Sequence, residues 1–341
     1  MDTLARLMAY IEKSPSPFHA VRSAAALLEE AGFVRLEESR EWRLEEGGAY
    51  YVTRNQSSLI AFRLPTAALT GWRMTAAHSD SPTFRVKSDS MSGDKGYIRL
   101  EVEGYGGMNC ASWLDRPLTV AGRAVVETPA GVEGRLVHLD RDLLTIPSLA
   151  IHQQRDVNKG HDYNLQRDMQ PLYGAEGAPS LTHLLAEALG VEDSDILATD
   201  LVLCPRQKPV CIGPEGEFFQ APRIDDLGCA YAPWKGFLPP LPPPVLVRST
   251  ASSTMKRWAA VPGRGLWAVS FPTYLPGRPK SWAWARRRSV RPWPAACCSV
   301  PTTAMPSIPT LPKRPIRRTG LTSTAVWSSS STPVRNIPPL A

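Results

Sequence analysis

Apolar residues at helical spacing open the chain. In residues 3–12, apolar positions such as Leu4 and Leu7 recur at intervals of three and four, which predicts an amphipathic helix. Residues 14–33 begin with Ser and Pro, continue as a run rich in Ala and Leu, and stop at a Gly, so they predict a second helix. The chain is therefore expected to start with two helices.

Runs rich in β-branched and aromatic residues follow these helices. Residues 49–55, 57–64 and 72–80 each predict a strand. Polar residues end the last of these runs. Helices that feed strands, with polar side chains at a strand tip, predict an α/β sheet whose site lies at the strand ends.

From about residue 85 the pattern becomes mostly β. It predicts one helix at 180–190 and strands with Gly turns at 97–107, 118–127, 134–140 and 195–205. We therefore expect a β-rich insert at 85–212. This insert interrupts an α/β domain whose two parts are residues 1–84 and 213–232.

The composition changes near residue 233. Residues 1–232 carry 23 Lys or Arg and all 32 Asp or Glu, a net charge of −9, whereas residues 233–341 carry 16 Lys or Arg and no acid. All six histidines lie in the first part and 20 of the 33 prolines in the second. A basic, Trp-bearing tail could bind nucleic acid through phosphate contacts and stacking. The proline density forbids helices and central strands, however, so we expect a disordered tail and no nucleic-acid partner.

The cysteines and the chain start bear on the compartment. None of the six cysteines has the spacing of a metal knuckle or of paired disulfides, which favours a reducing environment. The sequence shows no signal-peptide pattern and no apolar run of membrane-spanning length. We therefore expect a soluble, cytoplasmic protein with no membrane partner.

His78 and Asp80 lie two residues apart at the end of the predicted strand 72–80. Alternation along a strand places both side chains on one face. A zinc-binding His usually passes its other ring proton to a carboxylate, and Asp80 is placed to be that partner. The alternative is a polar turn without function, because the motif is short.

The remaining candidates also have structural alternatives. Asp225 and Asp226 in "RIDDLG" could bridge two divalent metals for hydrolysis, or could cap a helix N-terminus. His152 and His161 are core or surface imidazoles unless partners lie near them. Cys229 is either a thiol ligand or a small buried residue.

Three other motifs carry no chemistry on their own. "EGYGGMN" has the spacing of a strand-end turn rather than of a phosphate loop. The neighbours Asp115 and Arg116 are typical of a structural ion pair. The basic run at 285–289 lacks the surroundings of a phosphate-binding groove.

Five stretches in one order are similar to a known family. They are "SPSPFHAV", "AAHSDSPTFRVK", "YGGMNCASWLDRPLTVAGRAV", "IPSLAIHQQRDVN" and "APRIDDLGCAYA". Together they resemble the aspartyl aminopeptidases, cytosolic metallopeptidases with two zinc ions per subunit. Over residues 1–232 the resemblance implies a zinc-peptidase-like α/β/α catalytic domain, interrupted by a mostly β dimerisation domain.

The resemblance also implies roles for matching residues. His78 would ligate one zinc, Asp80 would orient it, and Asp225 would bridge both ions. His152 would extend from the insert to the active site of a neighbouring subunit, in a dimer that builds a dodecamer. The substrates would be peptides with N-terminal Asp or Glu, hydrolysed by a zinc-activated water with a Glu as general base.

The tail departs from the family's pattern. The family next requires a Glu–Glu pair, an Asp ligand and a His ligand. Residues 233–341 contain no Asp, Glu or His. A complete dinuclear site therefore cannot be built from this chain alone.

A one-base shift of reading frame restores the missing pattern. In "STMKRWAAVP" (253–262), Met255 and Lys256 force a shifted Glu codon, and the stretch can encode Asp-Asn-Glu-Glu-Val-Gly-Ser. The same shift recovers family-like stretches at 301–310 and 315–321. We therefore expect a frame change near residues 230–233, in the gene or in its sequencing.

Two function classes follow for the chain as written. The first is a zinc aminopeptidase that is inactive because its Glu base and later ligands are missing. The second is a non-catalytic scaffold or nucleic-acid-binding protein with a basic, disordered tail at 233–341. Zinc binding and cleavage of a peptide with an acidic N-terminus discriminate between them.

Overall fold

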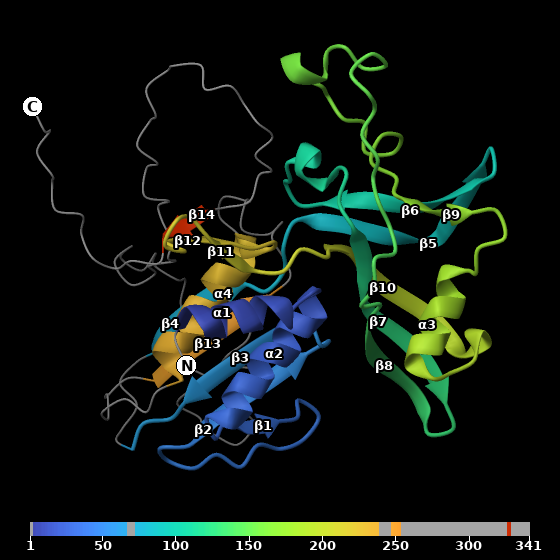
Figure 1. The fold of residues 1–341 in the computed structure, drawn as a ribbon. Coiled ribbons are helices and arrows are strands. Elements are labelled where there is room, and N and C mark those ends of the chain that lie inside the picture. Colours follow the sequence, from blue (N-terminus) through green and yellow to red (C-terminus); the bar gives the residue numbers. More distant parts are fainter. Residues whose placement is uncertain (1–2, 67–71, 239–246, 254–325, 329–341) are drawn as a thin grey trace, which may run out of the picture.

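The computed structural model describes residues 3–66, 72–238, 247–253 and 326–328 (Figure 1). Its described strands form a five-stranded sheet, a six-stranded sheet and a three-stranded sheet. The arrangement is mixed α/β, as predicted. None of the described helices is long and apolar enough to cross a membrane.

Two helices open the described chain, where the apolar spacing predicts them. Helix α1 (Thr3–Glu12) buries Tyr10 and Ile11. Helix α2 (Pro17–Glu30) is capped by Ser16, whose hydroxyl accepts a hydrogen bond from the backbone N–H of His19. Pro17 suits the first helical position because an N–H there has no helical partner.

The first sheet has the order β1-β2-β3-β13-β4. Its strands are β1 (Val34–Leu36), β2 (Ala49–Arg54), β3 (Ser58–Arg63), β13 (Val247–Ser253) and β4 (Trp72–His78). Strand β13 pairs antiparallel with β3 and parallel with β4, and Ser253 is in register with His78. The segments that precede and follow the second sheet in the sequence thus pair with each other in the first sheet.

Helices cover one face of the first sheet. Residues of α1, α2 and α4 (Ile224–Phe237) form one core cluster with Tyr51, Leu59 and Ala61 from β2 and β3. The alternate residues Tyr50 and Phe62 belong to a smaller cluster. Alternation along the strands explains this division between the two faces.

Two elements differ from the expectation for the tail. Helix α4 continues through Pro233 to Phe237, and β13 lies between two other strands of the first sheet. The prediction that this region holds no central strand is therefore wrong for residues 247–253, which contain no proline. Most of 233–341, including the basic run at 285–289, lies outside the described residues.

The second sheet is antiparallel and has the order β8-β7-β10-β5-β6-β9. Its strands are β5 (Thr83–Asp94), β6 (Tyr97–Tyr105), β7 (Leu118–Thr128), β8 (Gly131–His138), β9 (Leu172–Ala175) and β10 (Ile196–Pro205). Helix α3 (Leu181–Leu189) adds Leu181, Leu184 and Leu185 to its core. The sequence limits of the insert, 85–212, stay a prediction.

Three short 3₁₀ helices and a small sheet complete the elements. They are η1 (Cys110–Trp113), η2 (Val157–Lys159), η3 (Asp193–Asp195), and strands β11 (Val210–Ile212), β12 (Phe218–Gln220) and β14 (Val326–Ser328). Figure 1 shows that the segment between β8 and β9, which contains η2, projects away from the second sheet.

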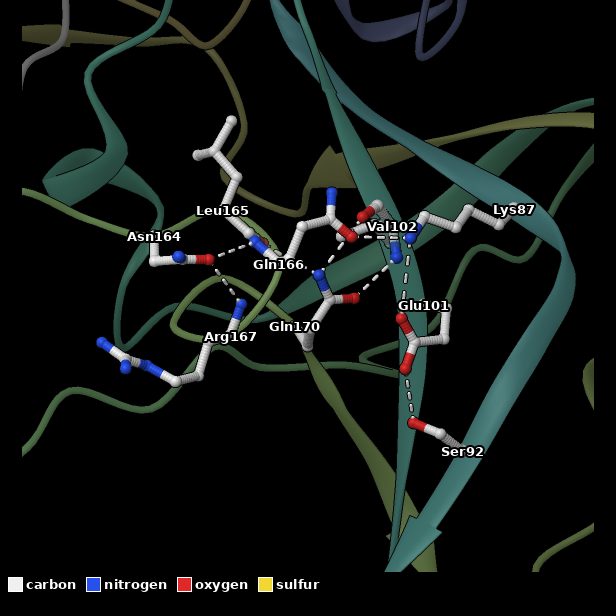
Figure 2. A network of polar contacts seen from close by, with 9 residues as sticks. All are labelled: Lys87, Ser92, Glu101, Val102, Asn164, Leu165, Gln166, Arg167 and Gln170. Carbon is white, nitrogen blue, oxygen red and sulfur yellow. Dashed lines mark hydrogen bonds and ion pairs between the residues drawn. The ribbon is translucent and has the colours of Figure 1, made fainter.

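The buried side chain of Gln170 fixes the end of this projecting segment (Figure 2). Its amide oxygen accepts a hydrogen bond from Val102 N–H at 2.7 Å. Its amide nitrogen donates to the carbonyls of Val102 and Leu165, at 3.2 and 2.8 Å. Gln170 thereby hydrogen-bonds both the N–H and the carbonyl of Val102 in β6, and so anchors the segment to the sheet.

Candidate functional site

His78 and Asp80 lie together at the end of β4. The Nδ1 atom of His78 is 3.5 Å from Oδ1 of Asp80, whose side chain is fully buried while that of His78 is 30% exposed. A carboxylate beside Nδ1 fixes the ring orientation and leaves Nε2 to face a ligand. The two side chains thus lie within ion-pair distance, and the role of Asp80 in orienting His78 stays a prediction.

Tyr105 is the further member of this group. Its hydroxyl donates a hydrogen bond of 2.6 Å to Oδ2 of Asp80. It belongs to β6, so the second sheet supports the His78–Asp80 pair of the first. The sequence analysis interpreted its motif, "EGYGGMN", only as a turn, because no local spacing connects two residues that lie 25 positions apart.

Asp225 lies at the start of α4, which packs against β4. Asp225 and Asp226 depart from helical backbone angles and so precede the regular helix. Asp225 is exposed and lines a cavity together with Ser79 and Ser81, the chain neighbours of Asp80. The structure thus brings the "RIDDLG" motif to the end of β4.

The same cavity has a volume of about 290 Å³ and is lined by Arg116. The predicted Asp115–Arg116 ion pair is not formed. Asp115 instead accepts a hydrogen bond from Ser148 N–H at 2.8 Å. Among the described residues, Arg116 has no hydrogen-bond or ion-pair partner, although burial lowers the pKa of its guanidinium. Only the motif "SWLDRP" marked this residue in the sequence.

The other candidates lie apart from this cavity. His152 is exposed in the projecting segment between β8 and β9. His161, in the same segment, contacts Asp168 at 3.7 Å and the ring of Tyr163 edge-on at 4.7 Å. Cys229 is half-buried in α4. His152 is therefore not brought to His78 within one chain.

Two histidines meet between α2 and the second sheet. His19 of α2 and His138 of β8 meet edge-on, with ring centroids 6.2 Å apart. Burial first, and then the charges of Arg22, His138 and Arg223, lower the pKa of His19 to about 3. Burial likewise lowers the pKa of His138. Both rings are therefore neutral at pH 7.

The described donor groups do not complete a zinc site. Zinc in proteins takes at least three protein ligands from His, Cys, Asp and Glu. No group of three or more such side chains is placed to hold a metal ion within the described part of the chain. His78 and Asp225 are thus at most part of a donor set.

The chain matches the aminopeptidase I zinc metalloprotease (M18) family over residues 10–243. A probable M18 family aminopeptidase 2 from Clostridium novyi (strain NT) is 38% identical over 240 residues. These residues cover 67% of this chain and 55% of that protein. The chain therefore spans only about half the length of this curated relative.

Solved structures agree with this match. The structure of mApe1 from Chaetomium thermophilum is 31% identical, with a TM-score of 0.68, and the match covers 73% of this chain and 61% of that one. The S. cerevisiae mApe1 dodecamer is 26% identical, with a TM-score of 0.62 and coverages of 74% and 60%. The chain belongs to the M18 family of aminopeptidase I zinc metalloproteases.

Proposed function

We propose that this chain carries part of the active site of a cytoplasmic metalloaminopeptidase that removes N-terminal Asp or Glu from peptides. The carrying observation is the arrangement of His78, buried Asp80 and Tyr105 at the end of β4, beside a cavity lined by Asp225. A carboxylate-supported histidine and a nearby aspartate are typical of zinc sites in hydrolases. The family membership supports the same chemistry.

Each of these residues would have a different role at such a site. Asp80 holds the His78 ring by its Nδ1 side, so that Nε2 is the atom offered to a metal. Asp225 would supply a bridging carboxylate between two ions. Zinc, when bound, supplies the Lewis acidity that peptide hydrolysis requires.

We further propose that the chain as written is inactive, because a frame change has displaced its later ligands. The family match ends at residue 243, and the last acidic residue of the chain is Asp226. A general base and further ligands of acidic or imidazole type cannot come from residues 233–341. Both observations support a junction near residues 230–233.

The proposed displaced stretch lies next to β13 in the sequence. The last residue of β13, Ser253, is in register with His78 at the end of β4. The displaced Asp-Asn-Glu-Glu stretch is encoded directly after this strand, around Met255 and Lys256.

His152 is proposed to act across a subunit interface. It is exposed on the segment that projects from the second sheet. One related structure is a dodecamer. A homo-oligomer built from dimers would allow this histidine to approach a neighbouring active site.

Cleavage assays with a corrected gene test the proposed function. When the one-base frame change near residues 230–233 is corrected, we expect the protein to hydrolyse peptides that begin with Asp or Glu. We expect no hydrolysis by the chain as written. The matched variants His78→Ala and His183→Ala compare the candidate ligand with an exposed histidine of α3. A corrected protein that cleaves no acidic peptide, or a His78→Ala variant with full activity, would overturn the proposal.

The nucleotide sequence tests the frame change separately. Codons for residues 253–262 should have third bases that permit Asp-Asn-Glu-Glu-Val-Gly-Ser in the shifted frame. Third bases that exclude the acidic codons would refute it. Nucleic-acid binding by an uncorrected, zinc-free chain would instead support the scaffold alternative.

A further inference from the structure

We infer that the cavity between the start of α2, the end of β4 and η1 is a carboxylate-binding pocket with Arg116 as its cationic contact. Its volume of about 290 Å³ is near the lower limit of small-molecule pockets, about 300 Å³. Ser79 and Ser81 line it, whereas His78 and Asp80 do not. The lining of this pocket thus excludes the His78–Asp80 pair, although it includes Asp225.

The charges on the cavity wall favour an anion. Its charged lining residues in the described chain are Arg116, Arg223 and Asp225. The guanidinium of Arg223 is already engaged, since it donates to Cys204 Sγ at 2.9 Å and to the Ile11 carbonyl at 3.1 Å. Arg116 is half-buried, has no such partner among the residues described, and its buried Nε atom makes no hydrogen bond.

Buried hydroxyls on the same wall also lack partners. Ser14 is 1% exposed and Ser81 is 8% exposed, and neither Oγ atom makes a hydrogen bond within the described structure. Folding rarely leaves buried polar groups unpaired. Ser16 and Pro17 place the N-terminus of α2 on the wall as well, and its dipole favours negative charge. Four independent features therefore favour an anionic ligand.

A single carboxylate group fits these features. A guanidinium binds a carboxylate through two parallel hydrogen bonds, and serine hydroxyls can donate to its oxygens. Two arginines and one aspartate leave one net positive charge, which one carboxylate neutralises. The carboxylate could belong to a free small molecule or to the acidic side chain of a bound peptide. The second source rests on the proposed function, whereas the pocket itself does not.

Calorimetric titration of the full chain with succinate tests the pocket. We expect binding of succinate and none of its neutral analogue, succinamide. Arg116→Gln should weaken succinate binding about tenfold or more, because a charge-assisted contact is lost. Arg43→Gln, which removes an exposed arginine outside the cavity, should leave the affinity unchanged.

Ser14→Ala separates binding from folding. Because the hydroxyl has no partner in the described structure, its loss should not lower the melting temperature. It should still weaken succinate binding by about threefold or more. Absence of succinate binding to the wild-type chain, or equal binding by the Arg116→Gln variant, would overturn the inference.

Two peptides identify the source of the carboxylate. An N-terminal Asp peptide that displaces succinate at a concentration about tenfold lower than its Asn counterpart would show that the pocket receives a substrate side chain. If succinate binds but the two peptides compete equally, the carboxylate pocket stands and its link to the peptidase fails. If succinate binds to neither the chain as written nor the corrected one, the pocket is wrong while the peptidase proposal survives.

Discussion

At the scale of single residues, Asp80 is the predicted orienting partner of His78. Its carboxylate is fully buried, and burial of a charge is costly unless donors surround it. One donor, Tyr105, comes from the second sheet at 2.6 Å. A hydroxyl of the second sheet thus contacts the carboxylate that lies beside a candidate metal ligand of the first.

Removal of that hydroxyl should therefore be costly. For Tyr105→Phe we expect the free energy of unfolding to fall by about 1–3 kcal/mol, because Asp80 loses a donor while it stays buried. Urea unfolding measures the change. Tyr97→Phe, on the same strand but 58% exposed, is the control and should change stability by less than about 0.5 kcal/mol. Equal changes in the free energy of unfolding for the two variants would show that the contact between Tyr105 and Asp80 does not stabilise the fold.

A role in positioning His78 makes a separate prediction. The ¹⁵N shifts of the His78 ring report which nitrogen carries the proton. In the wild-type chain, the contact with Asp80 should favour the proton on Nδ1. Tyr105→Phe should alter this preference, whereas a purely structural role for Tyr105 would lower stability and leave the ring shifts in place.

His19 makes stability depend on pH. Its pKa is lowered to about 3, chiefly by burial, whereas an unfolded His titrates near about 6.5. The unfolded state therefore binds the proton first as pH falls, and the stability present above pH 6.5 is lost below it. One such proton should lower the free energy of unfolding by about 2 kcal/mol between pH 7 and pH 5.

Urea unfolding of variants at the two pH values isolates this contribution. In His19→Gln, the fall in the free energy of unfolding between pH 7 and pH 5 should be smaller by about 2 kcal/mol. His152→Gln, which changes an exposed histidine, should keep all of it. The same pH dependence in both variants would mean that His19 is not buried and neutral in the native state.

At the scale of elements, local pattern predicts strands best where alternation is strong. Helices α1 and α2 and strands β2 and β3 lie within three residues of their predicted limits. Strand β5 was not predicted, since it carries a run of polar residues where its register with β6 shifts, between Val86 and Met91. Its pairing with β6 and β10 forms it despite that run.

In the candidate site, too, local contacts can be predicted from the sequence and long-range contacts cannot. The spacing of His78 and Asp80 is local, so alternation alone predicts that they meet. Tyr105 and Arg116 reach the end of β4 only because the second sheet folds beside it, and no local pattern contains that information. Strand β13 was missed because the proline content of the tail concealed a proline-free stretch at 247–253.

The projecting segment depends on one amide. Gln170→Leu should expose the segment between β8 and β9 to faster hydrogen exchange, because Val102 and Leu165 lose their buried partner. Loss of these hydrogen bonds should lower the free energy of unfolding by about 1–3 kcal/mol. Gln166→Leu, which removes an exposed contact with Lys87, is the matched control. Unchanged exchange in the segment of Gln170→Leu would contradict this role.

At the scale of the whole molecule, the described residues cover the two faces of the first sheet unequally. Three helices pack on one face, while the cluster around Tyr50 and Phe62 on the other is small. On β4, Met74 is 56% exposed. Sheets of α/β proteins usually bury both faces. We therefore expect the corrected C-terminal third to supply the missing cover together with the missing ligands.

Zinc content tests this account most directly. The chain as written and the chain with the one-base correction are purified, dialysed against trace-metal-free buffer and measured by mass spectrometry for zinc per polypeptide. We predict two zinc ions per corrected chain and fewer than one per chain as written, because the acidic and histidine ligands return only in the corrected frame. Equal zinc content in the two proteins would contradict the account.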